Sequence, residues 1–162
     1  MFRVGLGQDS HNFVNFKENK PLILGGVRVD EKGGLEGNSD GDVLLHSICN
    51  ALSSAVGGDS LSTWSDDMCN KGIKDSTHYV KYIFNKIKKL KYSIVNISIS
   101  VEAKTPYLKM EIINKIKERI ASLLKIEIEQ VGLTFTSGEG LTAFGLSKGI
   151  QALTIVSIVK HD

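Results

Sequence analysis

The chain is poor in the features that mark several common classes of protein. Its 162 residues include only two cysteines, Cys49 and Cys69, which form neither a CxxC pair nor a disulfide framework. No apolar run reaches membrane length, and the N-terminus lacks a charged-then-apolar signal pattern. The formal net charge of +2 is too close to zero to indicate nucleic acid. We therefore expect a protein of a reduced, aqueous compartment with neither a membrane nor a nucleic-acid partner.

The sequence also lacks the glycine-rich motifs of the standard nucleotide-binding folds. It contains no P-loop, and no Gly-x-Gly-x-x-Gly follows the first apolar segment. Apolar residues make up 41% of the chain and charged residues 23%, as in an ordinary globular protein. The length suits one domain over residues 1–162.

Hydrophobic periodicity predicts both strands and helices. Strands are expected at 2–7, 95–101, 131–135 and 150–159, with a hairpin of 22–24 and 27–29 that turns at Gly25-Gly26. Helices are expected from Val43, from Ser76 and from Pro106. Residues 60–74 are polar and irregular, typical of a surface connection or a substrate loop. This order predicts an α+β fold, a single-domain two-layer sandwich with three main helices on one face of a mixed β-sheet.

The stretch from Asn38 to Asn50 carries an unusual polar pattern. Ser39 and Asp42 have the spacing of a capping box at the start of a helix. That helix is apolar almost all round and should be buried, yet Asp42, His46 and Asn50 form one polar stripe on it. Two interpretations stay open from this helix alone. His46 is either a core histidine hydrogen-bonded to Asp42 or a metal ligand that Asp42 supports.

Two further segments offer metal ligands. Asp9 and His11 stand two residues apart at the end of an expected strand, so their side chains point to one face. With His46 they offer one carboxylate and two imidazoles, a set that suits zinc with a fourth position open for substrate or water. Glu139, in the glycine- and hydroxyl-rich loop 136–140, suits magnesium or manganese on a phosphate.

Five segments of the chain, taken with their order and spacing, resemble those of the 2-C-methyl-D-erythritol 2,4-cyclodiphosphate synthase family. The resemblance covers nearly the whole chain and rests on Gly7-Gln8-Asp9-Ser10-His11-Asn12-Phe13, Ser39-Asp40-Gly41-Asp42-Val43-Leu44-Leu45-His46, Gly58-Asp59, Ala103-Lys104-Thr105-Pro106 and Thr136-Ser137-Gly138-Glu139. It implies a cytoplasmic enzyme, or one of the plastid stroma in a eukaryote, of non-mevalonate isoprenoid biosynthesis. Such an enzyme converts 4-diphosphocytidyl-2-C-methyl-D-erythritol 2-phosphate to the 2,4-cyclodiphosphate and releases CMP. The resemblance also implies a homotrimer with active sites between subunits.

The resemblance assigns roles to particular residues. It implies one zinc ion per subunit on Asp9, His11 and His46, and a magnesium or manganese ion on Glu139 that bridges the substrate's phosphates. Asn38, Ser137 and Glu139 would take part in catalysis, and Asp42 would support His46. Asp59 would hold ribose, residues 103–109 the cytosine and its phosphate, and residues 64–68 the erythritol. The implied substrate-binding residues are Asp9, Ser10, His11, Asn38, Ser39, Asp59, Ser60, Leu61, Trp64, Ser65, Asp66, Asp67, Met68, Ala103, Lys104, Thr105, Pro106, Lys109, Thr136, Ser137, Gly138 and Glu139.

The chain departs from the family pattern mainly where positive charge is usual. Asn38, Tyr107 and Leu146 stand where a histidine, a lysine and an arginine are common, and Trp64-Ser65-Asp66-Asp67 replaces the more usual Phe-Pro-Asp-Thr. We therefore expect metal ions to neutralise more of the charge on the diphosphate. Two other functions fit the same residues. One is a zinc-dependent phosphoesterase that uses metal-bound water, and the other is a non-catalytic, metal-dependent module that binds cytidine nucleotides.

Overall fold

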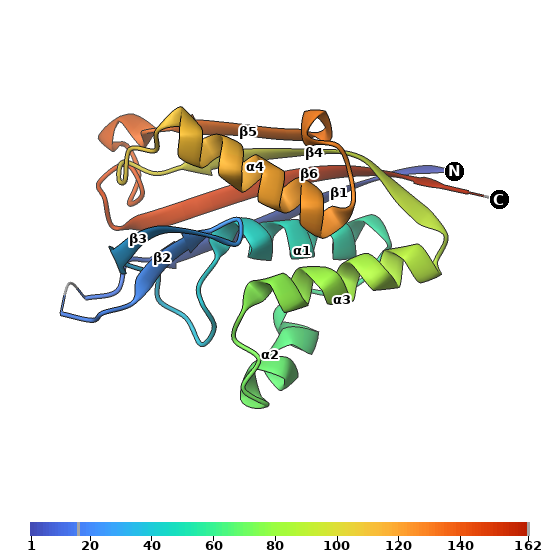
Figure 1. Cartoon of the computed structure of the whole chain (residues 1–162), viewed down its shortest axis with the longest axis horizontal. Coiled ribbons are helices and arrows are strands. Elements are labelled where there is room, and N and C mark those ends of the chain that lie inside the picture. The colour runs from blue at the N-terminus through green and yellow to red at the C-terminus, as the bar shows by residue number, and fades with distance from the viewer. Residues whose placement is uncertain (16, 162) are drawn as a thin grey trace.

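A four-stranded sheet runs through the molecule in the order β1-β6-β4-β5 (Figure 1). The computed structural model describes residues 1–15 and 17–161. The strands are β1 (Phe2–Asn12), β4 (Tyr92–Glu102), β5 (Val131–Thr136) and β6 (Gly149–Lys160). Because β6 pairs antiparallel with β1 and β4 while β4 and β5 are parallel, the expected mixed sheet is confirmed. A separate hairpin of β2 (Pro21–Leu24) and β3 (Val27–Gly33) turns at Gly25 and Gly26, as predicted.

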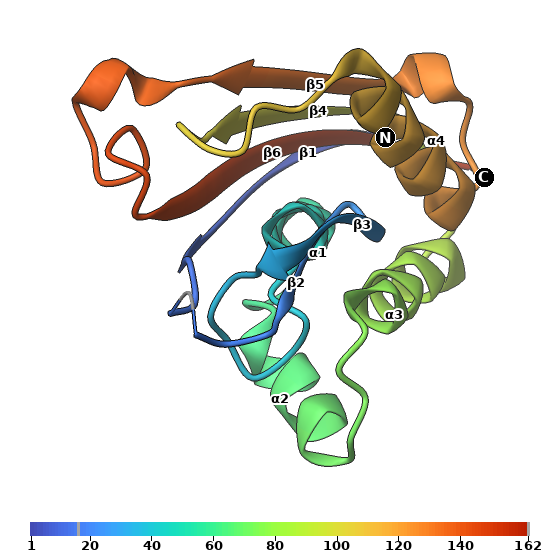
Figure 2. The ribbon, with the colours of Figure 1, turned by 60° about the vertical axis from the view of Figure 1, so that its left-hand side comes forward.

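Helices cover one face of this sheet (Figure 2). They are α1 (Val43–Ala55), α2 (Ser62–Asn70), α3 (Ser76–Lys89) and α4 (Met110–Leu124), with short 3-10 turns η1 (Ile128–Gln130) and η2 (Gly138–Gly140). Figure 2 shows α1 next to the sheet and α2 farthest from it. The three long helices confirm the predicted two-layer sandwich. No helix within residues 1–15 and 17–161 is long and apolar enough to cross a membrane.

Two expectations about helices were wrong. Residues 60–74 contain α2 rather than an irregular loop. The apolar face of α2 is only Trp64 and Met68, one turn apart, which is too short a repeat to give a periodic signal. The third long helix begins at Met110 rather than at Pro106, because Lys109 before it is still extended. A proline suits the first turn of a helix, but it also occurs in the extended segment that precedes one.

Two glycines of β1 let α1 lie very close to the sheet. A Cβ atom at Gly5 would lie 2.0 Å from the carbonyl oxygen of Ala51, and one at Gly7 would lie 2.2 Å from the backbone nitrogen of Ala51. Any side chain at these positions would therefore push the helix away. Since side chains alternate along a strand, Asp9 and His11 face the same side as the two glycines and point toward α1. The close packing thus sets the distance from β1 to the side chains of α1.

Candidate metal centre

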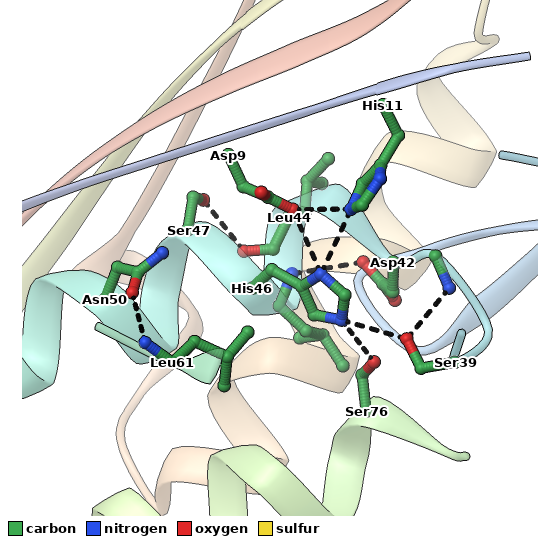
Figure 3. Close-up of polar contacts among 12 residues, drawn as sticks. Asp9, His11, Ser39, Asp42, Leu44, His46, Ser47, Asn50, Leu61 and Ser76 are labelled. Carbon is green, nitrogen blue, oxygen red and sulfur yellow. Dashed lines mark hydrogen bonds and ion pairs between the residues drawn. The ribbon is translucent and has the colours of Figure 1, made fainter. Parts of the chain in front are cut away.

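Asp9, His11 and His46 bring three ligand atoms together at the start of α1 (Figure 3). Asp9 Oδ2 lies 2.8 Å from His11 Nε2 and 3.0 Å from His46 Nδ1, and these two nitrogens are 3.3 Å apart. In a tetrahedral zinc site with bonds of about 2.0–2.1 Å, neighbouring ligand atoms are roughly 3.3 Å apart. The three atoms therefore outline one face of a tetrahedron of nearly the right size, which leaves a fourth position open.

The electrostatics of the three side chains favour a bound cation. Burial alone would raise the pKa of Asp9, but hydrogen bonds and charges from His11 and His46 outweigh burial and lower that pKa to about 2. Asp9 is therefore ionised at neutral pH. His46 is almost completely buried while Asp9 and His11 are partly exposed, so the three-ligand position is open to solvent.

Asp42, which was expected to support His46, binds elsewhere. Its carboxylate accepts hydrogen bonds at 2.6–3.0 Å from the backbone N–H groups of Leu45 and of both glycines in the β2–β3 turn. Asp42 is therefore the N-cap of α1, in place of the Ser39 expected there, and it fastens the hairpin to the helix. Burial, assisted by the charge of Asp40, raises the pKa of Asp42 to about 6 despite those three hydrogen bonds. The predicted contact between Asp42 and His46 side chains was wrong, because the hairpin turn occupies both carboxylate oxygens.

His46 instead contacts a serine through its second ring nitrogen. His46 Nε2 lies 2.8 Å from the hydroxyl of Ser76, the fully buried first residue of α3, and Ser76 is in turn hydrogen-bonded to Asp40 (Figure 3 shows the first contact). In the sequence, Asp40 is visible only as part of a motif and Ser76 only as the start of a helix. Neither residue carried a signal for the other, since they stand 36 residues apart in the chain.

A pocket of about 320 Å³ lies beside the three ligands. It is lined by Asp9, His11, Gly37, Asn38, Ser39, His46, Leu61, Ser62, Ser65, Asp66, Cys69 and Tyr79. Four of these residues share one face of α2 at helical spacing: Ser62, Ser65, Asp66 and Cys69. Gly37, Ser62, Cys69 and Tyr79 were not expected in this lining. Ser62 and Cys69 belong to the unexpected helix α2, and Tyr79 has the spacing of a core residue on α3. Asn38 lines the pocket, and its carbonyl accepts a hydrogen bond from the Cys69 thiol at 3.2 Å.

Some residues expected to line this pocket lie away from it. Trp64 stacks on Tyr82 of α3, with 4.7 Å between ring centroids, and packs with Met68 against the core. Ser10 alternates to the opposite face of β1 from Asp9. Helix and strand geometry turns these three side chains away from the pocket lining of the single chain, and their contact with substrate stays a prediction. Asp59, Ser60 and Asp67 are exposed and lie outside the pocket lining.

A second pocket, also of about 320 Å³, lies at the carboxyl ends of the parallel strands β4 and β5. It is lined by Ala103, Lys104, Pro106, Tyr107, Leu108, Met110, Ile113, Phe135, Thr136 and Ser137. The structure thus brings together most of the two loops expected to hold a nucleotide, though Thr105, Lys109, Gly138 and Glu139 are outside the lining itself. Glu139 is exposed next to it, and the Ser137 hydroxyl donates a hydrogen bond to Glu139 Oε1 at 2.7 Å.

The two pockets are at opposite edges of the sheet within one chain. Asp9 of β1 pairs with Ala152, Ala152 with Val101, and Val101 with Phe135 of β5, so Asp9 and Phe135 stand at the same level. Three strand spacings separate them, which is roughly 14 Å. One chain alone therefore does not place Glu139 beside the three metal ligands.

The fold and the site together define a class: α+β proteins with an open, three-ligand metal site, the kind that metalloenzymes use for catalysis. Within that class the chain belongs to the YgbB family, whose model matches residues 2–159. The 2-C-methyl-D-erythritol 2,4-cyclodiphosphate synthase of Chlamydia muridarum is 38% identical over 161 residues, which cover 99% of this chain and 89% of the relative. That of Chlamydia felis is 36% identical over 162 residues and is covered to 91%.

Solved structures agree with this membership. The structure described as the CDP complex of IspF from Plasmodium falciparum is 27% identical, with a TM-score of 0.85 over 99% of this chain and 97% of that one. The bifunctional IspDF of Campylobacter jejuni is 30% identical with a TM-score of 0.89, and the match covers all of this chain and 43% of that protein. The resemblance found from the sequence motifs is therefore confirmed.

Proposed function

We propose that this chain is a 2-C-methyl-D-erythritol 2,4-cyclodiphosphate synthase. It converts 4-diphosphocytidyl-2-C-methyl-D-erythritol 2-phosphate to the 2,4-cyclodiphosphate with release of CMP, and is thus a cyclising phosphorus–oxygen lyase of isoprenoid biosynthesis. The observation that carries the proposal is the convergence of Asp9, His11 and His46 beside an open pocket, in a chain that belongs to this family.

The reaction needs little covalent chemistry from the protein. An oxygen of the substrate's own 2-phosphate attacks the β-phosphorus, and the bond from that phosphorus to the oxygen bridging the α- and β-phosphates breaks, so the bridging oxygen leaves with CMP. Because nucleophile and leaving group belong to one molecule, catalysis consists mainly of positioning and charge neutralisation. Asn38 and Ser39, next to the metal ligands, can donate hydrogen bonds to phosphate oxygens.

The ligand set favours zinc as the resident metal. Two imidazoles and one carboxylate with a fourth position open is the donor set of catalytic zinc sites. Asp9, His11 and His46 would hold the ion, and the ion would supply Lewis-acid polarisation of the β-phosphate. We assign a second ion, magnesium or manganese, to Glu139, whose exposed carboxylate is a hard oxygen ligand suited to phosphate-bound cations.

The second pocket is assigned to the cytidine nucleotide. Backbone groups of residues 103–106 and the hydroxyls of Thr136 and Ser137 lie together there, held by a hydrogen bond of 3.0 Å from the N–H of Ala103 to the carbonyl of Thr136. Asp59 is assigned to the ribose across a subunit boundary, consistent with its exposure in the single chain. The CDP complex of the Plasmodium falciparum structure supports a cytidine nucleotide as the ligand of this fold.

A homotrimer would unite the two pockets. Glu139 and the three metal ligands must act on one diphosphate, yet they lie at opposite edges of the sheet. A neighbouring subunit that presents its β5 edge to the β1 edge of this one would complete the site. The sheet face turned away from the helices also exposes apolar side chains that an assembly would cover, namely Phe2, Val4, Leu6, Leu153 and Ile155.

The test is an assay with purified protein, zinc and magnesium. The diphosphocytidyl substrate should give stoichiometric CMP and the cyclic diphosphate, resolved by phosphorus NMR, and the protein should sediment as a trimer. An acyclic product that carries oxygen from labelled water would instead identify a zinc phosphoesterase. Calorimetric binding of cytidine nucleotides with no CMP release would identify a binding module, and either result would overturn the proposal.

A further inference from the structure

The second ring nitrogen of His46 belongs to a buried network that the reaction scheme does not use. While His46 Nδ1 faces Asp9 and His11, His46 Nε2 points the other way and lies 2.8 Å from the hydroxyl oxygen of Ser76. The Ser39 hydroxyl is a more distant neighbour of the same nitrogen, at 3.4 Å. Ser76 is fully buried, so water does not compete for its hydroxyl group.

Asp40 holds Ser76 by two hydrogen bonds. The Ser76 hydroxyl donates to Asp40 Oδ1 at 2.5 Å, and the Ser76 backbone N–H donates to Asp40 Oδ2 at 2.9 Å. Asp40 is itself held in place, because its backbone N–H donates to the carbonyl of Lys74 at 2.9 Å and its carboxylate accepts from the N–H of Asp42 at 3.1 Å. The first turn of α3 and the loop before α1 are thereby joined behind the histidine.

The number of available hydrogen atoms fixes which group donates in the hydrogen bonds that join His46, Ser76 and Asp40. A serine hydroxyl has one hydrogen, and an ionised carboxylate only accepts. Since Ser76 gives its hydrogen to Asp40, the Ser76 oxygen can only accept from His46, so His46 Nε2 must carry a hydrogen. Nδ1, the atom that faces Asp9 and His11, is then the ring nitrogen that binds a metal ion, which would displace any hydrogen that Nδ1 donates to Asp9.

We propose that Ser76 and Asp40 are positioning residues for the metal, which hold the His46 ring through its Nε2–H and so aim Nδ1 at the ion. The role that the sequence motif suggested for Asp42 thus falls to a serine and a different aspartate. Hydrogen-bond partners of ligating histidines typically change metal affinity by about 10- to 100-fold when they are removed. The inference rests on the proposed metal site, but its test needs no synthase activity.

The test compares Ser76→Ala with wild type in two measurements on the purified protein. Competition with a chromogenic chelator should show zinc affinity weakened by about 10- to 100-fold in the variant. Proton–nitrogen NMR of the zinc-loaded protein should show the His46 Nε2–H protected from exchange with water in wild type and exchanging faster in the variant, which lacks the buried acceptor. Asp40→Asn, which keeps the shape but leaves one acceptor oxygen, should weaken zinc binding by a smaller factor in the same direction.

Asp75→Ala is the matched control for damage to the start of α3. Asp75 caps the same helix by accepting from the N–H of Thr77 at 2.8 Å, but it has no contact with His46 in the described structure. This variant should lose stability and keep both its zinc affinity and the exchange protection of its His46 Nε2–H. The proposal is overturned if Ser76→Ala binds zinc within twofold of wild type, if its His46 Nε2–H stays equally protected, or if Asp75→Ala weakens zinc binding equally. If the synthase assay fails but the variants still show these changes in zinc binding, the proposed function is overturned and the positioning role of Ser76 and Asp40 stands.

Discussion

The two pockets of this chain are built in opposite ways. The metal centre lies between a strand and a helix, where backbone packing at Gly5 and Gly7 sets the spacing and His46 is buried. The second pocket is lined largely by the loops after β4 and β5, and Glu139 beside it is exposed in the left-handed region with φ of 48°. The loop that carries Glu139 is tied back by a contact between the Thr142 hydroxyl and Glu102 and by a hydrogen bond of 3.2 Å from the N–H of Lys104 to the carbonyl of Phe144.

This difference teaches how the chemistry is divided between the two pockets. A metal that stays bound through many turnovers needs ligands held in place before the ion arrives. The ion that we propose at Glu139 would enter with the substrate, and it would need a carboxylate that remains accessible until the nucleotide is bound. The four predictions below test this division, from the largest expected effect to the smallest.

Replacing a ligand in the rigid pocket should have the largest effect. The His46→Ala variant lacks one of the three ligand atoms of the tetrahedral site, so zinc binding should be lost. Lewis-acid stabilisation of the transition state is worth several kcal/mol, and each 1.4 kcal/mol is tenfold in rate, so CMP release should fall about 1,000-fold. Metal analysis after dialysis and a CMP-release assay check this result. Retention of stoichiometric zinc in this variant would refute the three-ligand assignment.

Gly7→Ala should damage the same pocket without touching a ligand. The new methyl group would collide with the backbone of Ala51, at a cost of about 1–3 kcal/mol of unfolding free energy, and would move α1 away from β1. Zinc affinity should fall at least about tenfold with that separation. Urea unfolding and chelator competition measure the two effects.

Gly132→Ala on β5 is the matched control for this variant. A Cβ atom there would meet its nearest neighbour at 3.6 Å, which is an ordinary contact. Its stability should stay within about 0.5 kcal/mol of wild type, and its zinc affinity should be unchanged. Equal loss of zinc in both glycine variants would show that close packing of α1 on β1 does not set the geometry of the site.

Glu139→Gln should impair the loop pocket and spare the metal centre. Losing one charged ligand should raise the magnesium concentration for half-maximal CMP release about tenfold, equivalent to about 1.4 kcal/mol, while zinc affinity stays constant. Glu129→Gln, which changes an exposed glutamate of the η1 turn before β5, is the control and should leave both quantities unchanged. A drop in zinc affinity in Glu139→Gln would show that Glu139 also affects zinc binding, and would contradict the division of roles between the two pockets.

Trp64→Phe should have the smallest effect. Trp64 stacks on Tyr82 away from the pocket, so the change should lower stability by about 1 kcal/mol and leave KM within twofold. Asp66→Ala, on the opposite face of α2, should raise KM severalfold with little change in stability. Steady-state kinetics of both variants measures KM, and thermal unfolding measures stability. A larger KM effect in Trp64→Phe than in Asp66→Ala would show that the Trp64 face of α2, rather than the Asp66 face, meets the substrate.

Local patterns in the sequence were enough to predict most of the elements and the three side chains that converge as candidate metal ligands. Alternation along β1 places Asp9 and His11 on one face, and helical periodicity buries the helix that carries His46. The glycine pair predicts the hairpin turn because both of its residues need positive φ. Each of these patterns depends only on residues close together in the sequence, so it can be recognised without knowing how the rest of the chain folds.

Only the tertiary structure decided what surrounds those ligands. The partner of Asp42 is a hairpin turn 16 residues or more away, and the partner of His46 is a serine 30 residues away. Sequence spacing carries no information about such pairs, because packing of whole elements brings them together. For the same reason a short polar segment became α2, with its aromatic residue in the core and its serines facing the pocket. Hydrophobic periodicity predicts which face of a helix or strand a residue occupies, and the packing of these elements determines which residues it contacts.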